Sequence, residues 1–226
     1  MNSACLQTKQ IPVILLLMCV CCLQAQNIEF GGIFGVEYER ELKRNFHLSV
    51  ESEAKIRHNF TDFHRLKAGA GLNYAFWNKR IKIDGMVNYL LAHKKSYYEN
   101  RCRINVSLSY TERIRRWKLS YRIASQFLFY QTQKSEHPYN PKIYLRNKLR
   151  IEYKFVNQPV NLYLSTEFFW RMYKNYVVDK WRTVLGVTYR INKQHHLDFY
   201  LQSDNEVQVK KRDNIFSAGV AYSFKH

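Results

Sequence analysis

The stretch KIYLRNKLRIEYKF, residues Lys142–Phe155, decides the fold. Ile143 and every second residue after it, up to Phe155, are apolar or aromatic, with the single exception of Asn147. The residues between them are charged, apart from Tyr144. Side chains of a β-strand alternate between two faces, whereas an α-helix cannot separate two faces with a period of two. The stretch therefore predicts a long strand with one apolar and one charged face.

The same alternation recurs along the rest of the chain. The 226 residues include 17 Tyr, 14 Phe and 4 Trp against 8 Gly and 4 Pro, a composition typical of strands. No apolar run reaches the roughly 18 residues that a membrane-spanning helix needs, which excludes a helical membrane bundle. We predict eleven strands, at roughly 28–39, 46–58, 63–76, 81–92, 100–111, 117–131, 143–155, 160–173, 180–191, 196–205 and 214–224.

The breaks between these strands alternate in character. Short turns are expected at 40–45, 77–80, 112–116, 156–159 and 192–195. Looser and more polar connections are expected at 59–62, 93–99, 132–142, 174–179 and 206–213. Short turns at one end of a sheet and longer loops at the other are typical of an outer-membrane β-barrel.

Two architectures accommodate strands of this kind. In a soluble sandwich the apolar faces meet in a core, whereas in a membrane barrel they meet lipid and the charged faces line the interior. The predicted strands exceed the usual globular length of about 5–6 residues and suit a tilted crossing of about 9–11. Aromatic residues such as Trp77, Trp117 and Tyr189 gather beside the short turns, where an interfacial girdle belongs. We predict an all-β, antiparallel up-and-down transmembrane β-barrel of 10–12 strands, formed by residues 26–226.

The odd number of predicted strands conflicts with this architecture. Bacterial single-chain barrels have an even number of strands, so that both chain ends lie on the periplasmic side. The predicted turns would place the start of strand 28–39 outside the cell. We therefore expect either that this segment is not a full crossing, which gives ten strands, or that the chain contains a twelfth.

The first 25 residues predict a secretory signal peptide. Lys9 precedes the apolar run 11–23, and the small residue Ala25 follows as a cleavage site. A lipoprotein signal is the alternative, because Cys19, Cys21 and Cys22 lie in this segment; however, none follows the Gly or Ala that usually precedes a lipid-modified cysteine. Cleavage near Ala25 would leave Cys102 as the single cysteine and exclude an internal disulfide.

The closing strand is similar to the C-terminal targeting signal of outer-membrane proteins, although Lys225 and His226 follow its last aromatic residue, Phe224. The strand endings "LNYAFWNKR", "IEYKFVNQP", "GVTYRINKQHHLDFYLQ" and "GVAYSFKH" repeat one hairpin pattern. This pattern resembles the domain-of-unknown-function-2490 family of bacterial outer-membrane barrels, over most of residues 28–224. The resemblance implies a barrel in the outer membrane of a Gram-negative cell, and it transfers no catalytic residue.

The charged faces predict a basic interior, since the chain has 36 Lys and Arg against 18 Asp and Glu. Either a network of cross-strand ion pairs plugs the lumen, because unpaired buried charges are costly, or the lumen is a pore that favours anions. Bases at the rims would contact membrane lipid headgroups and lipopolysaccharide phosphates. We expect the lumen to be lined by the bases Arg65, Arg101, Arg103, Arg122, Arg146, Arg150 and Arg182, and by the acids Glu51, Glu53, Asp84, Glu152, Glu167 and Asp198.

A non-catalytic role follows from these residues: either a small pore for anionic solutes or a plugged structural barrel. The sequence contains no nucleotide, metalloprotease or serine-hydrolase motif, and we expect no cofactor, no metal site and no nucleic-acid partner. The barrel-assembly machinery is the expected protein partner. The alternative is an outer-membrane hydrolase of lipase or protease type at the extracellular rim, where the predicted loops offer His58, Asp62, His64, His93, Asp204 and Asp213.

Overall fold

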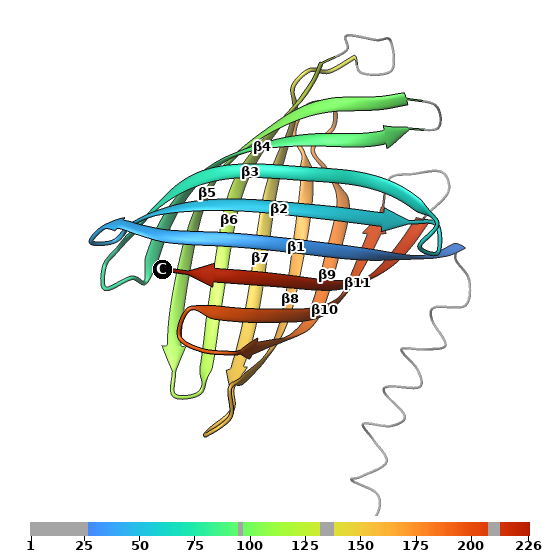
Figure 1. Ribbon diagram of the computed structural model, residues 1–226. Helices are drawn as coiled ribbons and strands as arrows, with labels where there is room; N and C mark the ends of the chain where they lie inside the picture. The colour runs from blue at the N-terminus through green and yellow to red at the C-terminus, as the bar shows by residue number, and fades with distance from the viewer. Residues whose placement is uncertain (1–26, 95–96, 132–137, 208–212) are drawn as a thin grey trace, which may run out of the picture.

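The computed structural model describes residues 27–94, 97–131, 138–207 and 213–226, which form a single closed barrel (Figure 1). The predicted all-β barrel is confirmed, and the alternative of a two-sheet sandwich is wrong. The described part of the chain contains no helix long and apolar enough to cross a membrane. Its strands are β1 (Asn27–Lys43), β2 (Phe46–Arg57), β3 (Asp62–Phe76), β4 (Ile81–Lys94), β5 (Tyr97–Ile114), β6 (Trp117–Tyr130), β7 (Lys142–Lys154), β8 (Val160–Arg171), β9 (Val177–Arg190), β10 (His195–Glu206) and β11 (Asp213–Lys225).

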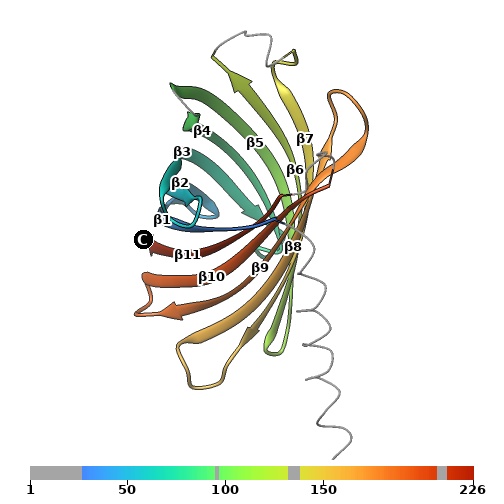
Figure 2. The ribbon, with the colours of Figure 1, turned by 90° about the vertical axis from the view of Figure 1, so that its right-hand side faces the viewer.

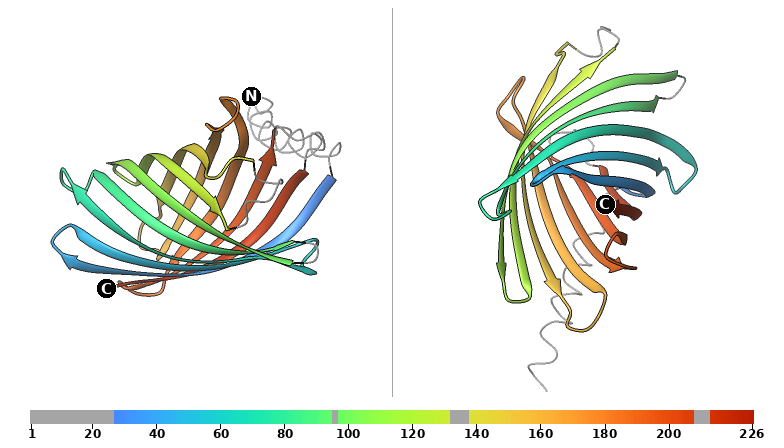
Figure 3. Two further views of the ribbon diagram at one scale, coloured as in Figure 1. Left: turned by 90° about the horizontal axis from the view of Figure 1, so that it is seen from above. Right: turned by 60° about the vertical axis from the view of Figure 1, so that its left-hand side comes forward.

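A parallel seam between β1 and β11 closes the barrel. Each of the other neighbouring pairs is antiparallel, and the seam runs in register from Asn27 beside Asp213 to Glu39 beside Lys225. In an up-and-down barrel with eleven strands, the first and last strands necessarily run in the same direction. The eleven strands lie within the predicted range of 10–12, but the expected reduction to ten or addition of a twelfth is wrong, and so is antiparallel pairing throughout. Figures 2 and 3 show the strands curving as one layer, with the C-terminus beside the β1–β2 turn.

The two ends of the barrel differ less in loop length than the sequence predicts. At one end, which we call the turn end, the connections are residues 44–45, 77–80, 115–116, 155–159 and 191–194. The opposite loop end has connections 58–61, 95–96, 131–141, 172–176 and 207–212. The looser connection predicted at 93–99 is wrong, because β4 and β5 extend through most of it. The predicted signal peptide, residues 1–25, lies outside the described residues.

The two faces of the strands divide as the period of two predicts. Outward-facing side chains are large and apolar, and Val106 and Leu201, for example, are 51% and 64% exposed. The inward-facing side chains on the same strands are mainly polar or charged, and Lys55, Glu167 and Asp204 are almost completely buried. The barrel therefore has an apolar outer surface and a polar interior.

Contacts from the last residues of the chain extend the seam at the turn end. The rings of Tyr38 and Phe224 stack across it with centroids 5.6 Å apart. Beyond Phe224, the His226 amide donates to the Glu39 carbonyl at 2.8 Å, and the Glu41 amide donates to the His226 carbonyl at 3.0 Å. The two residues that depart from an aromatic C-terminus thus continue the pairing of β1.

A row of alternating tyrosines and glycines fills the interior beside β8–β11. Tyr163 pairs with Gly186, Gly186 with Tyr200, and Tyr200 with Gly219 on successive strands. A Cβ atom at Gly186 would lie 2.4 Å from Tyr163 Cζ, and one at Gly219 would lie 2.2 Å from Tyr200 Cζ. Each ring therefore covers the bare backbone of a neighbouring strand, an arrangement that compensates for glycine in a sheet.

Candidate functional site: the charged lumen

The interior of the barrel contains a cavity of about 690 Å³, which is lined by residues from β1 to β10. Its lining is dominated by charged and polar side chains, as the alternation of the strands predicts. Nine of the thirteen predicted lumen residues line this cavity: Arg65, Arg101, Arg103, Arg122, Arg146, Arg182, Glu51, Glu53 and Asp84.

The remaining four predicted residues lie on the inward faces beside the cavity. Glu167 accepts hydrogen bonds from two arginines, and Glu152 pairs with Lys118 Nζ at 3.5 Å. The Arg150 guanidinium lies 3.7 Å from the centre of the Tyr163 ring. Asp198 accepts hydrogen bonds from Tyr163 at 2.8 Å and from Thr188 at 3.0 Å, so it belongs to the tyrosine–glycine row and has no basic partner among the described residues.

Five of the interior carboxylates are each shared between two bases. Glu167, for example, lies 2.8 Å from Arg122 and 2.9 Å from Arg146, and its side chain is 3% exposed. Four of these clusters have one more positive than negative charge, whereas in the Glu53 cluster Lys67 also contacts Glu51 and the group is neutral. The five clusters are Glu39 with Lys82 and Lys225, Glu53 with Arg65 and Lys67, Glu152 with Lys118 and Arg150, Glu167 with Arg122 and Arg146, and Asp204 with Lys55 and Arg182.

The Asp204 cluster crosses the parallel seam from the inside. Lys55 on β2 reaches Asp204 on β10 at 3.4 Å, over the buried Ile33 and Ser217 of the two seam strands. The expectation that Asp204 lies in an outer loop is wrong, because β10 continues to Glu206 and the side chain of Asp204 is buried inside the barrel. Asp204 lies an even number of residues from Asp198, which is predicted to face the lumen, and this alternation would have identified it.

Aromatic rings hold part of the surplus positive charge. The ring of Phe169 on β8 has three cations over it: Arg146 at 4.7 Å, Lys180 at 4.4 Å and Arg182 at 5.5 Å. Tyr130 is approached in the same way by Arg101 and Lys142, both at 5.1 Å. An aromatic face attracts a cation without supplying a negative charge. These rings therefore fix the bases in place and leave the net charge of the lumen positive.

Arg103 lines the cavity without a carboxylate partner in the described part of the chain. Within the described residues, no carboxylate oxygen lies within 4.0 Å of its guanidinium, and its Nε is buried without a protein acceptor. The positive charges of Arg65, Arg146 and Arg182 repel that of Arg103. The negative charge of Glu53 compensates this repulsion only in part. The Nε atoms of Arg57, Arg65, Arg122 and Arg171 are also buried without a protein acceptor. The cavity thus presents hydrogen-bond donors and positive charge to whatever occupies it.

The histidines of the predicted rim site do not converge. His58 Nδ1 lies 3.3 Å from Asp62 and 3.8 Å from Glu29, in the exposed β2–β3 connection. His64 instead lines the lumen cavity. His93 contacts the ring of Tyr98 at the end of β4, and Asp213 begins β11. Among the described residues, no group of three or more His, Cys, Asp or Glu could hold a metal ion.

The charges of the lumen are distributed unevenly around the barrel. We call the inward faces of β5–β9 the basic wall; they carry Arg101, Arg103, Arg122, Arg146 and Arg182. We call the inward faces of β11, β1 and β2 the seam wall. Its contribution to the cavity is mainly acidic, and consists of Glu37, Glu39, Ser49, Glu51, Glu53 and Arg57.

Comparison with known proteins identifies the family. No curated protein matches the chain. A family model described as "Protein of unknown function (DUF2490)" matches residues 31–215, which include most of β1 and all of β2–β10. The match confirms the resemblance carried by the hairpin endings. The chain belongs to the DUF2490 family.

Proposed function

We propose that this protein is an outer-membrane β-barrel whose lumen admits small anionic solutes. The membrane location is supported by the outward-facing apolar side chains and by the aromatic pairs at the turn end, such as Trp117 with Tyr153. Such side chains are unfavourable in water and favourable in a bilayer. We propose that the barrel-assembly machinery inserts the chain, which has the targeting-like closing strand β11.

One observation carries the anion preference: the described lining of the cavity has twelve Lys and Arg against seven Asp and Glu, and Arg103 among them has no carboxylate within 4.0 Å. A lumen with surplus positive charge raises the local concentration of anions and lowers that of cations. The ion pairs lie along the wall and leave the cavity of about 690 Å³. This arrangement favours the pore over the plugged barrel.

Ion conductance across a planar bilayer tests this proposal. Protein that starts at residue 26 is folded in detergent and added to a planar bilayer with a tenfold gradient of potassium chloride. We expect stable conductance steps and a reversal potential with the sign of chloride selectivity. A correctly folded barrel that conducts no ions, or one that prefers potassium, would overturn the proposal.

We propose that the barrel is not a hydrolase. His58 and Asp62 form a pair, yet Thr61 next to them donates its hydroxyl to the His58 carbonyl at 2.5 Å rather than to the His58 ring. A hydrolase of serine type needs a hydroxyl that the imidazole can deprotonate. Release of nitrophenol from short- and long-chain esters by the folded barrel, lost in a His58→Ala variant, would contradict this.

A further inference from the structure

The turn end of the barrel carries a concentrated positive charge that the lumen does not explain. The five turns, two residues on either side of each, and the C-terminal residues contain exposed bases and no Asp or Glu. Glu41, Glu112 and Glu152 lie just outside this window. We call these exposed bases the collar: Lys43, Arg44, Lys79, Arg80, Arg113, Arg115, Arg116, Lys154, Arg190, Lys193 and Lys225.

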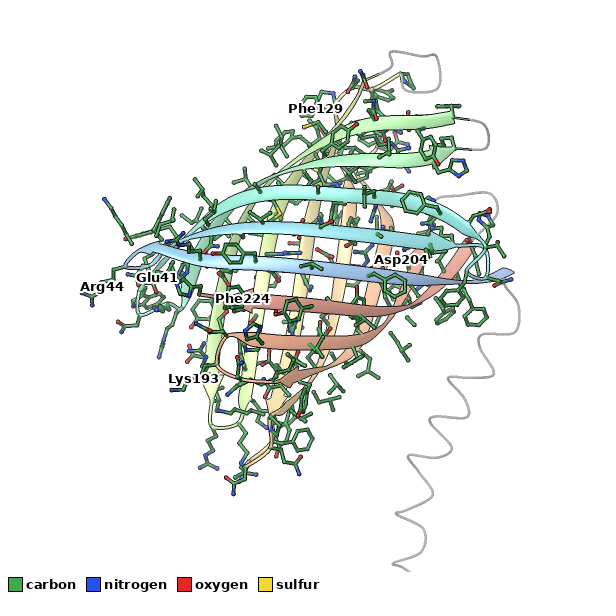
Figure 4. The ribbon with its side chains drawn as sticks, viewed as in Figure 1. Glu41, Arg44, Phe129, Lys193, Asp204 and Phe224 are labelled. Carbon is green, nitrogen blue, oxygen red and sulfur yellow. The ribbon has the colours of Figure 1, made fainter. Side chains whose placement is uncertain are left out.

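Most of the collar is free of ion pairs. Arg80 lies 3.2 Å from Glu112, and Lys225 lies 3.5 Å from Glu39. Within the described residues, the other nine bases have no carboxylate within 4.0 Å. Figure 4 shows Arg44 and Lys193 at two of these turns, extending away from the strands. Their donors are therefore available to an external anion.

Aromatic side chains stand directly beside the collar. Trp77 packs against Tyr110 with ring centroids 6.3 Å apart, and Trp117 packs against Tyr153 at 4.8 Å. Trp77 and Trp117 are 60% and 51% exposed, so both face outward. Tryptophan and tyrosine in this position settle at the level of lipid headgroups. The collar then lies in the headgroup layer itself.

The described residues of the loop end have a mixed charge. Arg171 pairs with Asp179, and His58 lies beside Glu29 and Asp62. The exposed bases described there include Lys94 and Lys174. Within the ranges that the structure describes, exposed bases without an ion pair are therefore more concentrated at the turn end than at the loop end.

We propose that the collar binds the headgroups of anionic phospholipids in the leaflet that surrounds the turn end. This inference rests on the membrane location proposed above, and it is independent of conduction through the lumen. Guanidinium and ammonium groups donate charge-assisted hydrogen bonds to phosphate oxygens. A cluster of such groups at a membrane surface selects lipids with a net negative charge over zwitterionic ones.

The four tryptophans allow both ends to be measured. Trp77 and Trp117 lie at the turn end, whereas Trp170 and Trp181 lie towards the loop end. The double variant Trp170→Phe, Trp181→Phe keeps only the two turn-end tryptophans, whose fluorescence is the turn-end reporter. The double variant Trp77→Phe, Trp117→Phe keeps only the other two, whose fluorescence is the loop-end reporter. Each protein is folded into vesicles of phosphatidylcholine that contain the same fraction of brominated phosphatidylglycerol or of brominated phosphatidylcholine. Both leaflets have one composition, so the orientation of the barrel does not affect the comparison.

We expect brominated phosphatidylglycerol to quench the turn-end reporter at least about two-fold more than brominated phosphatidylcholine does, and the loop-end reporter equally. Molar sodium chloride should abolish the difference, because it screens exposed charges. Neutralising five collar residues as Arg44→Gln, Lys79→Gln, Arg115→Gln, Arg116→Gln and Lys193→Gln should abolish it as well. The matched control, with Arg44, Arg115 and Arg116 each changed to Lys, keeps the charge and should retain the difference.

The outcomes separate the two proposals. Equal quenching of the turn-end reporter by both lipids, or a preference that survives both molar salt and charge removal, would overturn the collar proposal alone. An absence of quenching by either lipid, at both ends, would overturn the membrane location. If the five-fold variant fails to fold, the salt titration of the otherwise unchanged turn-end reporter decides the question.

Discussion

The basic wall and the seam wall are built from the same alternating strands, yet they fill the interior in different ways. The basic wall projects arginines that are held by shared carboxylates and by aromatic rings such as Phe169. On the seam strand β11, small residues such as Ser217 and Gly219 face inward. The strands β1 and β2 contribute carboxylates such as Glu51 to the cavity. The basic wall therefore supplies most of the positive charge, whereas the small residues of the seam wall leave space for side chains from neighbouring strands.

The difference indicates what each wall needs from its sequence. The basic wall needs its few acids, because each of them compensates two guanidinium or ammonium groups in a buried setting. The seam wall needs its small residues, because Tyr200 from β10 and the long side chain of Lys55 extend over neighbouring strands. The cavity lies where the two walls face each other, and Arg103 stands on its basic side.

The largest expected effect comes from the acid at the centre of the basic wall. Glu167→Gln leaves Arg122 and Arg146 without a carboxylate, and breaking a buried pair in this way costs about 3 kcal/mol. Glu51→Gln on the seam wall should cost less than about 1 kcal/mol, because its partner Lys67 keeps Glu53 at 3.1 Å. Urea unfolding of both variants in vesicles measures the difference. Equal losses would show that the two walls do not differ in this respect.

Adding a single methyl group at Gly219 tests whether the seam wall needs a residue without a side chain there. Gly219→Ala should lower the free energy of unfolding by about 2 kcal/mol, because its Cβ would collide with the Tyr200 ring. The matched control is Gly85→Ala on the outer face of β4, where no atom lies within 4 Å of an added Cβ. The same urea titration compares them. A Gly219→Ala barrel as stable as the control would contradict the packing of tyrosine over glycine.

Selectivity depends on the unpaired base of the basic wall. Arg103→Gln should reduce the preference for chloride over potassium about five-fold, since two unit charges about 4 Å apart in water interact by about 1 kcal/mol. Arg116→Gln, in the turn between β5 and β6, removes the same charge outside the lumen and is the control. Reversal potentials in planar bilayers measure both variants. An equal change in the two would place the selectivity outside the lumen.

Much of this comparison could be predicted from the sequence, because the period of two is visible in single residues. The alternation in 142–155 predicts the inward face of β7, and the eleven predicted strands all exist, with ends shifted by a few residues. Nine of the predicted lumen residues line the cavity for the same reason. The parity of a residue within a strand fixes its face, whichever strands are neighbours.

A parallel seam follows from the predicted count of eleven strands, but no local pattern records its register or which side chains it brings together. The ion pair between Lys55 and Asp204 depends on this closure, since it joins residues 149 positions apart in the chain. The sharing of five interior acids by two bases each likewise follows from the order of strands around the barrel. Long-range pairing of this kind is set by the tertiary structure and not by composition.

The accessibility and charge preference of the lumen test the account most directly. In a Cys102→Ser background, Asn105→Cys places a thiol at the cavity beside Arg103, and Val106→Cys places one on the outer face of the same strand. Each variant is treated separately with an anionic methanethiosulfonate that bears a sulfonate and with a cationic one that bears a trimethylammonium group. The rate of thiol modification of the folded protein is divided by that of the same variant when unfolded. We predict that Asn105→Cys reacts about five-fold faster with the anionic reagent, and that Val106→Cys in vesicles is protected from both. A lumen thiol that does not react, or one that prefers the cationic reagent, would contradict a water-filled, anion-favouring lumen.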